Sequence, residues 1–186
     1  MSQQELLIRV TDALEQQEIS YLLTGSFASS HQGEPRASHD IDLVVALSEA
    51  NLDLLCSQFP PPKYYVSAAA ARDAVRRKSM FNLLDLEEGD KVDFWLLTDS
   101  EFDRSRFDRR IQQELWGSNI WLSTPEDTIL AKLNWAKRSG GSAKQLGDVR
   151  GIFAVQKERL DLTYINEWAA RLDVVDLWNQ IRHSAD

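Results

Sequence analysis

Three aspartates lie in or beside apolar stretches of the kind that form β-strands. Asp40 and Asp42 are separated by one residue at the entrance of the stretch 41–47, so both side chains leave the same face of a strand and can bracket a hard divalent cation. Asp93 lies inside the stretch 92–97, where an unpaired carboxylate would cost several kcal/mol in desolvation. A metal ion, or use of Asp93 as a base, would explain this position. Taken alone, the Asp40 and Asp42 pair also fits a loop cap followed by a charge at a strand edge.

A short turn earlier in the chain has the residue types of an anion-binding site. Residues 21–24 indicate a buried strand, and Gly25 and Ser26 separate it from a helix that starts within residues 27–30. Glycine lets the backbone approach a phosphate closely, and a serine hydroxyl together with the free N–H groups of a helix start can donate hydrogen bonds to it. The turn therefore predicts a phosphate contact.

These residues follow one another in the order of a known motif. The segments are Leu23-Thr24-Gly25-Ser26, Asp40-Ile41-Asp42-Leu43 and Val92-Asp93-Phe94. Together they resemble the nucleotidyltransferase superfamily typified by DNA polymerase beta, whose pattern is a Gly-Gly or Gly-Ser turn, two acids spaced by one residue and a third acid on a nearby strand. Arg36 stands four residues before Asp40, similar to the Arg-x-Thr-x-Asp approach of many small bacterial members, with Ser38 in place of the common threonine.

The resemblance continues downstream. Residues 91–95 and 124–133 resemble uncharacterised bacterial nucleotidyltransferase-like proteins and abortive-infection-type toxins, in which a lysine of this helix and an aspartate of the next complete the site. The matching residues here are Lys132 and Asp148. Spacing alone fits a surface lysine at position 132 equally well, and an Asp148 that merely pairs with Lys144 or Arg150.

The resemblance implies transfer of a nucleoside monophosphate from an NTP to an acceptor, with release of pyrophosphate and with Mg²⁺ or Mn²⁺ as cofactor. Such transfer depends mainly on positioning and on charge neutralisation. Asp93 would accept the proton of the acceptor hydroxyl. The implied site residues are Asp40, Asp42 and Asp93 for the metal, Gly25, Ser26, Arg36 and Lys132 for the nucleotide, and Asp93, Asp40, Asp42, Lys132 and Asp148 for catalysis.

The elements that must position these residues follow from the apolar periodicity. The predicted fold class is α/β (α+β): a nucleotidyltransferase fold with a mixed twisted sheet, followed by a C-terminal helical bundle. We predict a catalytic domain over residues 1–115 and a helical domain over 116–186 that closes the cleft, with the seam near 112–124. The predicted strands are 21–24, 41–47, 80–86 and 92–97, the last two as a hairpin, and the predicted helices are 6–14, 48–59, 68–78, 124–138, 144–156, 163–172 and 174–181. The helix start at Thr124 follows from an N-cap threonine, a first-turn proline and an acidic third residue.

Composition limits the partners. The 186 residues are 43% apolar and carry a formal charge of −8, which is typical of a folded globular protein whose surface does not attract polyanions. Two arginine-rich stretches, 72–78 and 104–110, are solvated faces or local contacts for a nucleic acid or a triphosphate. The acceptor therefore stays open among an RNA end, a protein and a small molecule.

The location and the rival function also follow from simple features. One cysteine, no signal-peptide pattern and no stretch near the roughly 18 apolar residues of a membrane span predict a cytoplasmic protein without a membrane partner. The alternative to an enzyme is a catalytically silent nucleotide- or partner-binding protein of a toxin-antitoxin type system, with a cognate antitoxin protein as its partner. The intact set of three aspartates argues against that alternative.

Overall fold

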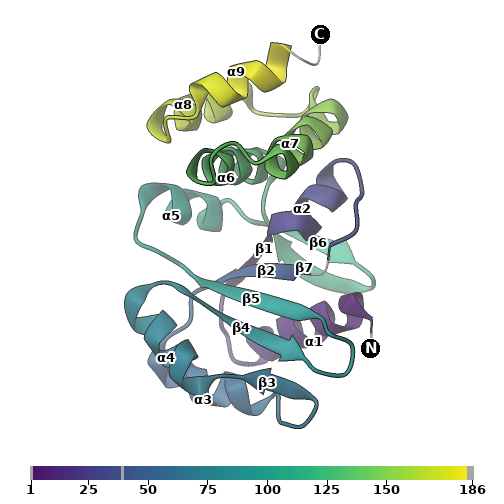
Figure 1. The fold of residues 1–186 in the computed structure, drawn as a ribbon, viewed down its shortest axis with the longest axis vertical. Helices are drawn as coiled ribbons and strands as arrows, with labels where there is room; N and C mark the ends of the chain where they lie inside the picture. The colour runs from purple at the N-terminus through teal and green to yellow at the C-terminus, as the bar shows by residue number, and fades with distance from the viewer. Residues whose placement is uncertain (1, 39, 184–186) are drawn as a thin grey trace. The chain divides into compact units, whose positions relative to one another are not determined.

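The computed structural model describes residues 2–38 and 40–183 (Figure 1). Strands and helices alternate over the first half of the chain, and helices dominate the second half. The strands within the described residues are β1 (Tyr21–Thr24), β2 (Asp40–Val45), β3 (Tyr64–Val66), β4 (Met80–Asp85), β5 (Lys91–Leu96), β6 (Ile111–Leu115) and β7 (Ser118–Leu122). The helices there are α1 (Gln3–Gln16), α2 (Gly25–Gln32), α3 (Glu49–Ser57), α4 (Ala68–Arg77), α5 (Glu101–Asp108), α6 (Pro125–Arg138), α7 (Ala143–Gln156), α8 (Leu162–Arg171) and α9 (Val175–His183).

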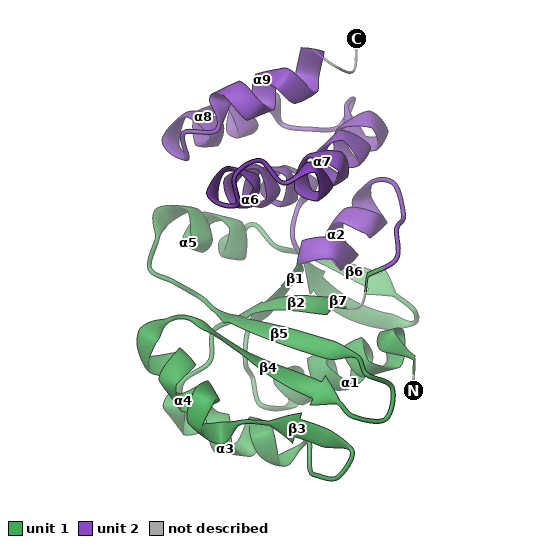
Figure 2. Ribbon diagram, viewed as in Figure 1, with its two compact units in different colours: residues 1–24, 38–122 green, residues 25–37, 123–186 purple. Residues whose placement is uncertain are grey.

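The chain divides into two compact units, coloured separately in Figure 2. Unit 1 comprises residues 1–24 and 38–122, and unit 2 comprises residues 25–37 and 123–186. This division differs from the predicted boundary between residues 115 and 116 in two ways. The hairpin β6–β7 belongs to unit 1, because β7 pairs with β1. Residues 25–37 belong to unit 2, because α2 packs against α6 and α7.

Unit 1 is built on a mixed sheet whose strand order, within the described residues, is β3-β4-β5-β2-β1-β7-β6. The pairs β2–β5 and β1–β7 are parallel and the remaining neighbours are antiparallel. The predicted mixed sheet is confirmed, including the hairpin of β4 and β5. Three strands were not predicted: β3 is only three residues long, and β6 and β7 carry a weak apolar pattern and a Trp-Gly turn in place of the usual Asn-Gly.

The two faces of this sheet differ in chemistry because side chains alternate along each strand. On one face, Leu43 and Phe94 are buried, and Phe94 stacks on Phe81 of β4 with ring centroids 4.9 Å apart. Helix α3 supplies Leu55 to the same apolar cluster. On the other face, Phe107 of α5 packs with the buried Leu22 and Val44. The aspartates of β2 and β5 lie on this second face, farther along the strands.

Unit 2 contains α2, α6, α7, α8 and α9. Helix α6 begins with the predicted cap, in which the Thr124 hydroxyl accepts a hydrogen bond from the Asp127 N–H and Pro125 takes the first helical position. Tyr164 of α8 donates to the buried Asp127 over 2.6 Å, and Trp178 of α9 packs edge-on against Phe153 of α7 with ring centroids 5.3 Å apart. The predicted C-terminal helical bundle is thereby confirmed.

Within residues 2–38 and 40–183, no helix is both long enough and apolar enough to cross a bilayer.

Candidate active site

The three aspartates occupy two neighbouring strands of unit 1. Strands β2 and β5 pair in parallel, with Asp42 directly opposite Asp93 and Asp40 directly opposite Lys91. Residues that face each other across a parallel pair point to the same side of the sheet. Asp40, Asp42, Asp93 and Lys91 therefore share one face, which we call the acidic face. The structure thus brings together the residues predicted to bind a metal.

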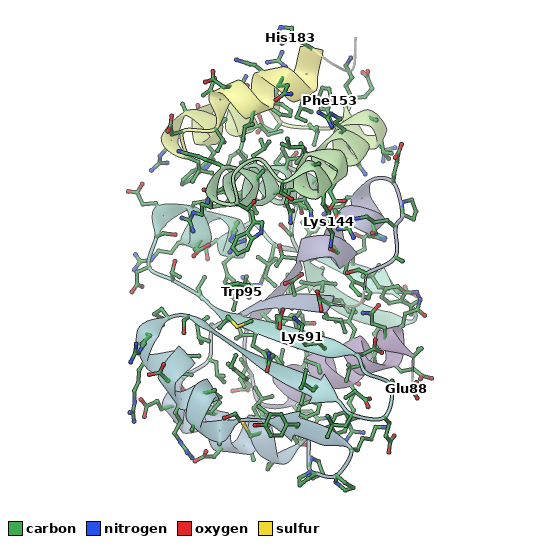
Figure 3. All side chains as sticks on the ribbon, in the orientation of Figure 1. Glu88, Lys91, Trp95, Lys144, Phe153 and His183 are labelled. Carbon is green, nitrogen blue, oxygen red and sulfur yellow. The ribbon has the colours of Figure 1, made fainter. Side chains whose placement is uncertain are left out.

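The carboxylates of the acidic face have basic and aromatic partners. The Lys91 ammonium lies 2.9 Å from Asp93 Oδ2 and 3.3 Å from Asp40 Oδ1. Trp95, two residues beyond Asp93, donates its indole N–H to Asp42 Oδ1 over 3.2 Å. Figure 3 labels Lys91 and Trp95 on β5. The hydrogen bond to Asp93 raises the pKa of Lys91, so the lysine is a cation at neutral pH.

Asp93 is the most enclosed of the three acids. It is 6% exposed, and its Oδ1 atom is buried without a hydrogen-bond partner among the described residues. A buried oxygen of this kind costs free energy unless a ligand satisfies it. The described residues of the protein do not satisfy Asp93 Oδ1, so this oxygen is available to a bound cation or to a proton donor of a ligand.

The chemistry of these donors fits a hard divalent cation. Carboxylate oxygens are the preferred ligands of Mg²⁺, and Asp42 and Asp93 supply them from adjacent positions of two paired strands. Within residues 2–38 and 40–183, no group of three or more His, Cys, Asp or Glu side chains already converges as a metal cage. The observed cation between Asp40 and Asp93 is the lysine ammonium. The acidic face thus has the right ligands, and Lys91 offsets one of its three negative charges.

The other predicted site residues gather in unit 2 around Asp148. Arg36 binds this carboxylate through both oxygens, with Nε 2.6 Å from Oδ1 and Nη2 2.8 Å from Oδ2. The same Nη2 donates to Ser26 Oγ over 2.7 Å. On the other side, Lys132 Nζ lies 2.6 Å from Asp148 Oδ2. We call Ser26, Arg36, Lys132 and Asp148 the basic cluster, because two cations surround one anion.

Two members of the basic cluster are buried, and Arg36 is partly exposed, with 26% of its side chain accessible. The side chains of Lys132 and Asp148 are 6% and 7% exposed, so the interpretation of Lys132 as a surface lysine is wrong. Burial by itself would raise the pKa of Asp148, but hydrogen bonds from Arg36 and Lys132 outweigh burial and lower this pKa to about 2. The carboxylate is therefore ionised at neutral pH, and the cluster keeps one net positive charge.

Backbone geometry places Ser26 and Arg36 in this cluster. Gly25 has φ +66°, a conformation that glycine adopts easily, and α2 starts there directly after β1. At the other end of α2, a Cβ on Gly33 would lie 2.5 Å from the Ile152 backbone nitrogen. The close approach of α2 to α7 that this glycine permits brings Arg36 and Asp148 within hydrogen-bonding reach.

Several contributors were missed from the sequence. Lys91 could have been found, because its position two residues before Asp93 predicts the same strand face. Gln145 accepts from Lys132 Nζ over 3.2 Å, and Ser29 donates to Asp148 over 3.3 Å. No motif marks these two residues, since their roles depend on how α2, α6 and α7 pack.

The arginine-rich stretches are mostly neutralised within the chain. Arg72 and Arg76 of α4 pair with Asp53 and Glu49 of α3 at 2.5 Å and 2.7 Å, and Arg77 pairs with Asp73 at 2.8 Å. In the second stretch, Arg104 pairs with Asp99 at 2.9 Å and Arg106 with Asp103 at 2.7 Å. Paired arginines offer a polyanion less attraction than a free basic face.

Comparison with known proteins gives structural likenesses only. No family model and no curated sequence matches the chain. The antibiotic-resistance factor ANT(2″)-Ia superposes with a TM-score of 0.62 at 12% identity, covering 98% of this chain and 97% of that one. A crystal structure of ANT(2″)-Ia with adenylyl-2″-tobramycin gives 0.61 at 13% identity, with 93% and 98% covered. The lincosamide antibiotic adenylyltransferase LnuA, bound to lincomycin, gives 0.56 at 12% identity, with 83% and 98% covered.

The fold follows from these likenesses. At such low identity they establish architecture, and the architecture is that of the nucleotidyltransferases. The expected nucleotidyltransferase fold is therefore confirmed.

Proposed function

We propose that this protein is a nucleotidyltransferase that moves a nucleoside monophosphate from an NTP to a hydroxyl group of an acceptor. One observation carries the proposal: Asp42 lies directly opposite Asp93 on two parallel strands, and Asp93 Oδ1 is buried without a partner among the described residues. Two carboxylates at paired positions, one with an oxygen that lacks a hydrogen-bond partner in the described part of the chain, carry more negative charge than the single Lys91 ammonium offsets, which favours binding of a further cation during function. The nucleotidyltransferase fold makes phosphate chemistry the natural use of such a site.

In the proposed reaction the residues of the acidic face divide two tasks. Asp40, Asp42 and Asp93 would hold Mg²⁺ or Mn²⁺, which when bound neutralises negative charge on the phosphates. Asp93 accepts the proton of the acceptor hydroxyl. The hydroxyl oxygen forms a bond to the α-phosphorus, the bond from that phosphorus to the bridging oxygen breaks, and pyrophosphate leaves with the bonding electrons.

The basic cluster is proposed to bind phosphate groups of the nucleotide. Its single net positive charge favours an anion, and Ser26 accepts from Arg36 while keeping its own hydroxyl proton to donate. Asp148 is a positioning residue in this proposal, because its two oxygens hold the Arg36 and Lys132 side chains in place. Gly25 leaves room at the start of α2 for a phosphate oxygen to approach the backbone.

For the acceptor we propose a small molecule rather than an RNA end or a protein. The structural neighbours ANT(2″)-Ia and LnuA are an antibiotic-resistance factor and a lincosamide antibiotic adenylyltransferase. The arginines of α4, which could otherwise contact RNA phosphates, are already paired with carboxylates on α3 and α4. The formal charge of −8 acts in the same direction.

The test is transfer of label from each of the four α-³²P-labelled NTPs. Purified protein is incubated with Mg²⁺ or Mn²⁺ and, in separate reactions, with aminoglycosides, lincosamides, total RNA and total protein. We expect label in one class of small molecule and stoichiometric release of pyrophosphate. Label in RNA or protein instead would overturn the choice of acceptor and leave the chemistry intact.

A matched pair of variants shows whether the acidic face is responsible. Asp42→Asn removes a carboxylate of the acidic face, whereas Asp99→Asn removes an exposed carboxylate whose ion pair with Arg104 is on the surface. Transfer should disappear in the first variant and persist in the second. Equal transfer in both would remove the acidic face from the mechanism.

A second candidate function has its own supporting observation. Lys91 already forms ion pairs with Asp40 and Asp93, which is how a catalytically silent nucleotide- or partner-binding protein, such as a component of a toxin-antitoxin type system, would stabilise part of the charge of retained acids. Such a protein would bind NTP without transferring label to any acceptor. Copurification of a small partner protein, together with no transfer, would favour this candidate.

A further inference from the structure

Lys91 occupies the place where a metal ion would be expected on the acidic face. Its ammonium contacts Asp93 Oδ2 at 2.9 Å and Asp40 Oδ1 at 3.3 Å, so one cation joins two of the three carboxylates. Both contacts come from strand register rather than from side-chain flexibility alone, since Lys91 lies opposite Asp40 and two residues before Asp93. The ion pair is therefore part of the paired strands β2 and β5.

We propose that Lys91 is an internal competitor for the divalent cation, which must leave the carboxylates of Asp40 and Asp93 before the metal can bind. This inference rests on the proposed function, because it assumes that the acidic face binds a metal. It assigns a role to a residue that the sequence analysis did not name as part of the site. Lys91 is in these terms a positioning residue that makes metal loading conditional.

The physical basis is repulsion between two cations at the same carboxyl groups, because Lys91 contacts Asp93 Oδ2 and Asp40 Oδ1. An ammonium and a divalent cation that share a carboxylate repel each other strongly over about 3 Å, even at the effective dielectric of a protein surface. They therefore do not share Asp93 Oδ2. The lysine can move because its four-carbon stem is flexible and its side chain is 32% exposed.

The ion pairs of Lys91 are expected to weaken the binding of a divalent metal, and this effect can be measured as a change in metal affinity. In the wild type, the metal gains the carboxylates but displaces an existing ion pair, which lowers its net affinity. A neutral residue at position 91 removes the competitor and leaves the carboxylates of Asp40, Asp42 and Asp93 on one face of the sheet. Removing a positive charge this close to the ligands relieves its repulsion of the metal, so the metal affinity is expected to rise on the order of tenfold or more.

The experiment measures the affinity for Mn²⁺ alone, without nucleotide, by electron paramagnetic resonance of the free ion and by calorimetry. Lys91→Met should lower the Kd for Mn²⁺ by on the order of tenfold. Lys91→Arg, which keeps the charge, should retain the wild-type Kd. Lys63→Met is the matched control, because Lys63 forms a 2.9 Å ion pair with Glu87 and its side chain is 29% exposed, much like that of Lys91.

The outcomes separate this inference from the proposed function. If wild type and Lys91→Met bind Mn²⁺ equally and Asp42→Asn does not bind it, the metal site stands and the role of Lys91 is refuted. If no protein, including Lys91→Met, binds Mn²⁺ at millimolar concentration, the metal site itself is refuted. Lys91→Gln gives a second reading should the methionine variant fail to fold, and a thermal melt of each variant without metal verifies folding.

Discussion

Asp42 places a negative charge beside that of Asp93 in the same register position of two strands. Removing this charge should therefore abolish activity without lowering the stability of the fold. We expect Asp42→Asn to reduce label transfer by at least about 10²-fold, as losses of electrostatic stabilisers do. The melting temperature should stay the same or rise, because carboxylate repulsion is relieved and the amide oxygen still accepts from Trp95. Transfer assays and thermal melts on the same preparation test both effects, and a fall in melting temperature would contradict the repulsion argument.

Asp148 makes a pH-dependent contribution to the stability of unit 2. Its pKa is about 2 in the folded protein and about 3.9 in an unfolded chain, so the unfolded state binds more protons between these values. The stabilisation is fully present above about pH 4 and is lost as the pH falls through about 2. The basic cluster thus holds Arg36 and Lys132 only while Asp148 is ionised.

The corresponding variant is Asp148→Asn. It leaves Lys132 buried without its anion, so we expect a loss of about 3 kcal/mol in the free energy of unfolding at neutral pH. Urea titrations between about pH 2.5 and 6 should show a smaller pH dependence for the variant than for the wild type. An identical pH dependence in both proteins would show that Asp148 is not the source of the pH-dependent part of the free energy of unfolding.

At the scale of elements, the approach of α2 to α7 depends on one glycine. A Cβ at Gly33 would lie 2.5 Å from the Ile152 nitrogen and 2.6 Å from the Gly151 carbonyl carbon, both backbone atoms that cannot turn away. Gly33→Ala should therefore cost about 1 to 3 kcal/mol, as overpacking does. Gly147→Ala is the matched control, because nothing lies within 4 Å of its Cβ position. In α7 it should gain about 0.5 to 1 kcal/mol, and urea denaturation of both variants decides.

In the turn of the β6–β7 hairpin, Trp116 adopts a left-handed backbone conformation that residues other than glycine disfavour. Trp116 has φ +50° and Gly117 has φ +80°, which is the pattern of a type I′ turn, where asparagine is preferred at the first position. A non-glycine residue held there costs on the order of 1 kcal/mol or more. Trp116→Asn should accordingly raise the free energy of unfolding by about 0.5 to 1 kcal/mol. A decrease, measured by chemical denaturation, would mean that contacts of the indole ring outweigh the strain.

At the scale of the whole molecule, ligand binding should be visible as stabilisation. A ligand present at about 100 times its Kd adds about 2.7 kcal/mol to the native state, which corresponds to roughly 5 to 10 °C in melting temperature for a chain of this length. We expect this shift with Mn²⁺ and the preferred NTP together, measured by calorimetry with a non-hydrolysable analogue. Asp42→Asn should show a clearly smaller shift, and an equal shift in the variant would place the metal elsewhere.

Much of the architecture is readable from local pattern. The strand 41–47 was predicted from its apolar run and is observed as β2, and the Thr124-Pro125 start of α6 was predicted from capping chemistry alone. The hairpin β6–β7 was missed, because its strands contain few apolar residues and its turn is Trp-Gly rather than the usual Asn-Gly. Local signals thus predicted the elements that carry a strong apolar or capping pattern, such as β2 and α6, and failed where that pattern is weak, as in β6 and β7.

The sequence by itself determined which residues are proposed to carry the chemistry: the order and spacing of Gly25, Asp40, Asp42 and Asp93 follow one motif along the chain. Only the tertiary structure decided which charged partners the acids have. Lys91 reaches Asp40 because β2 and β5 pair in one register, and a shift by one residue would turn it to the other face. Arg36 reaches Asp148 because helices far apart in the chain pack at a glycine. Such contacts depend on long-range packing energies, which no local pattern of residues records.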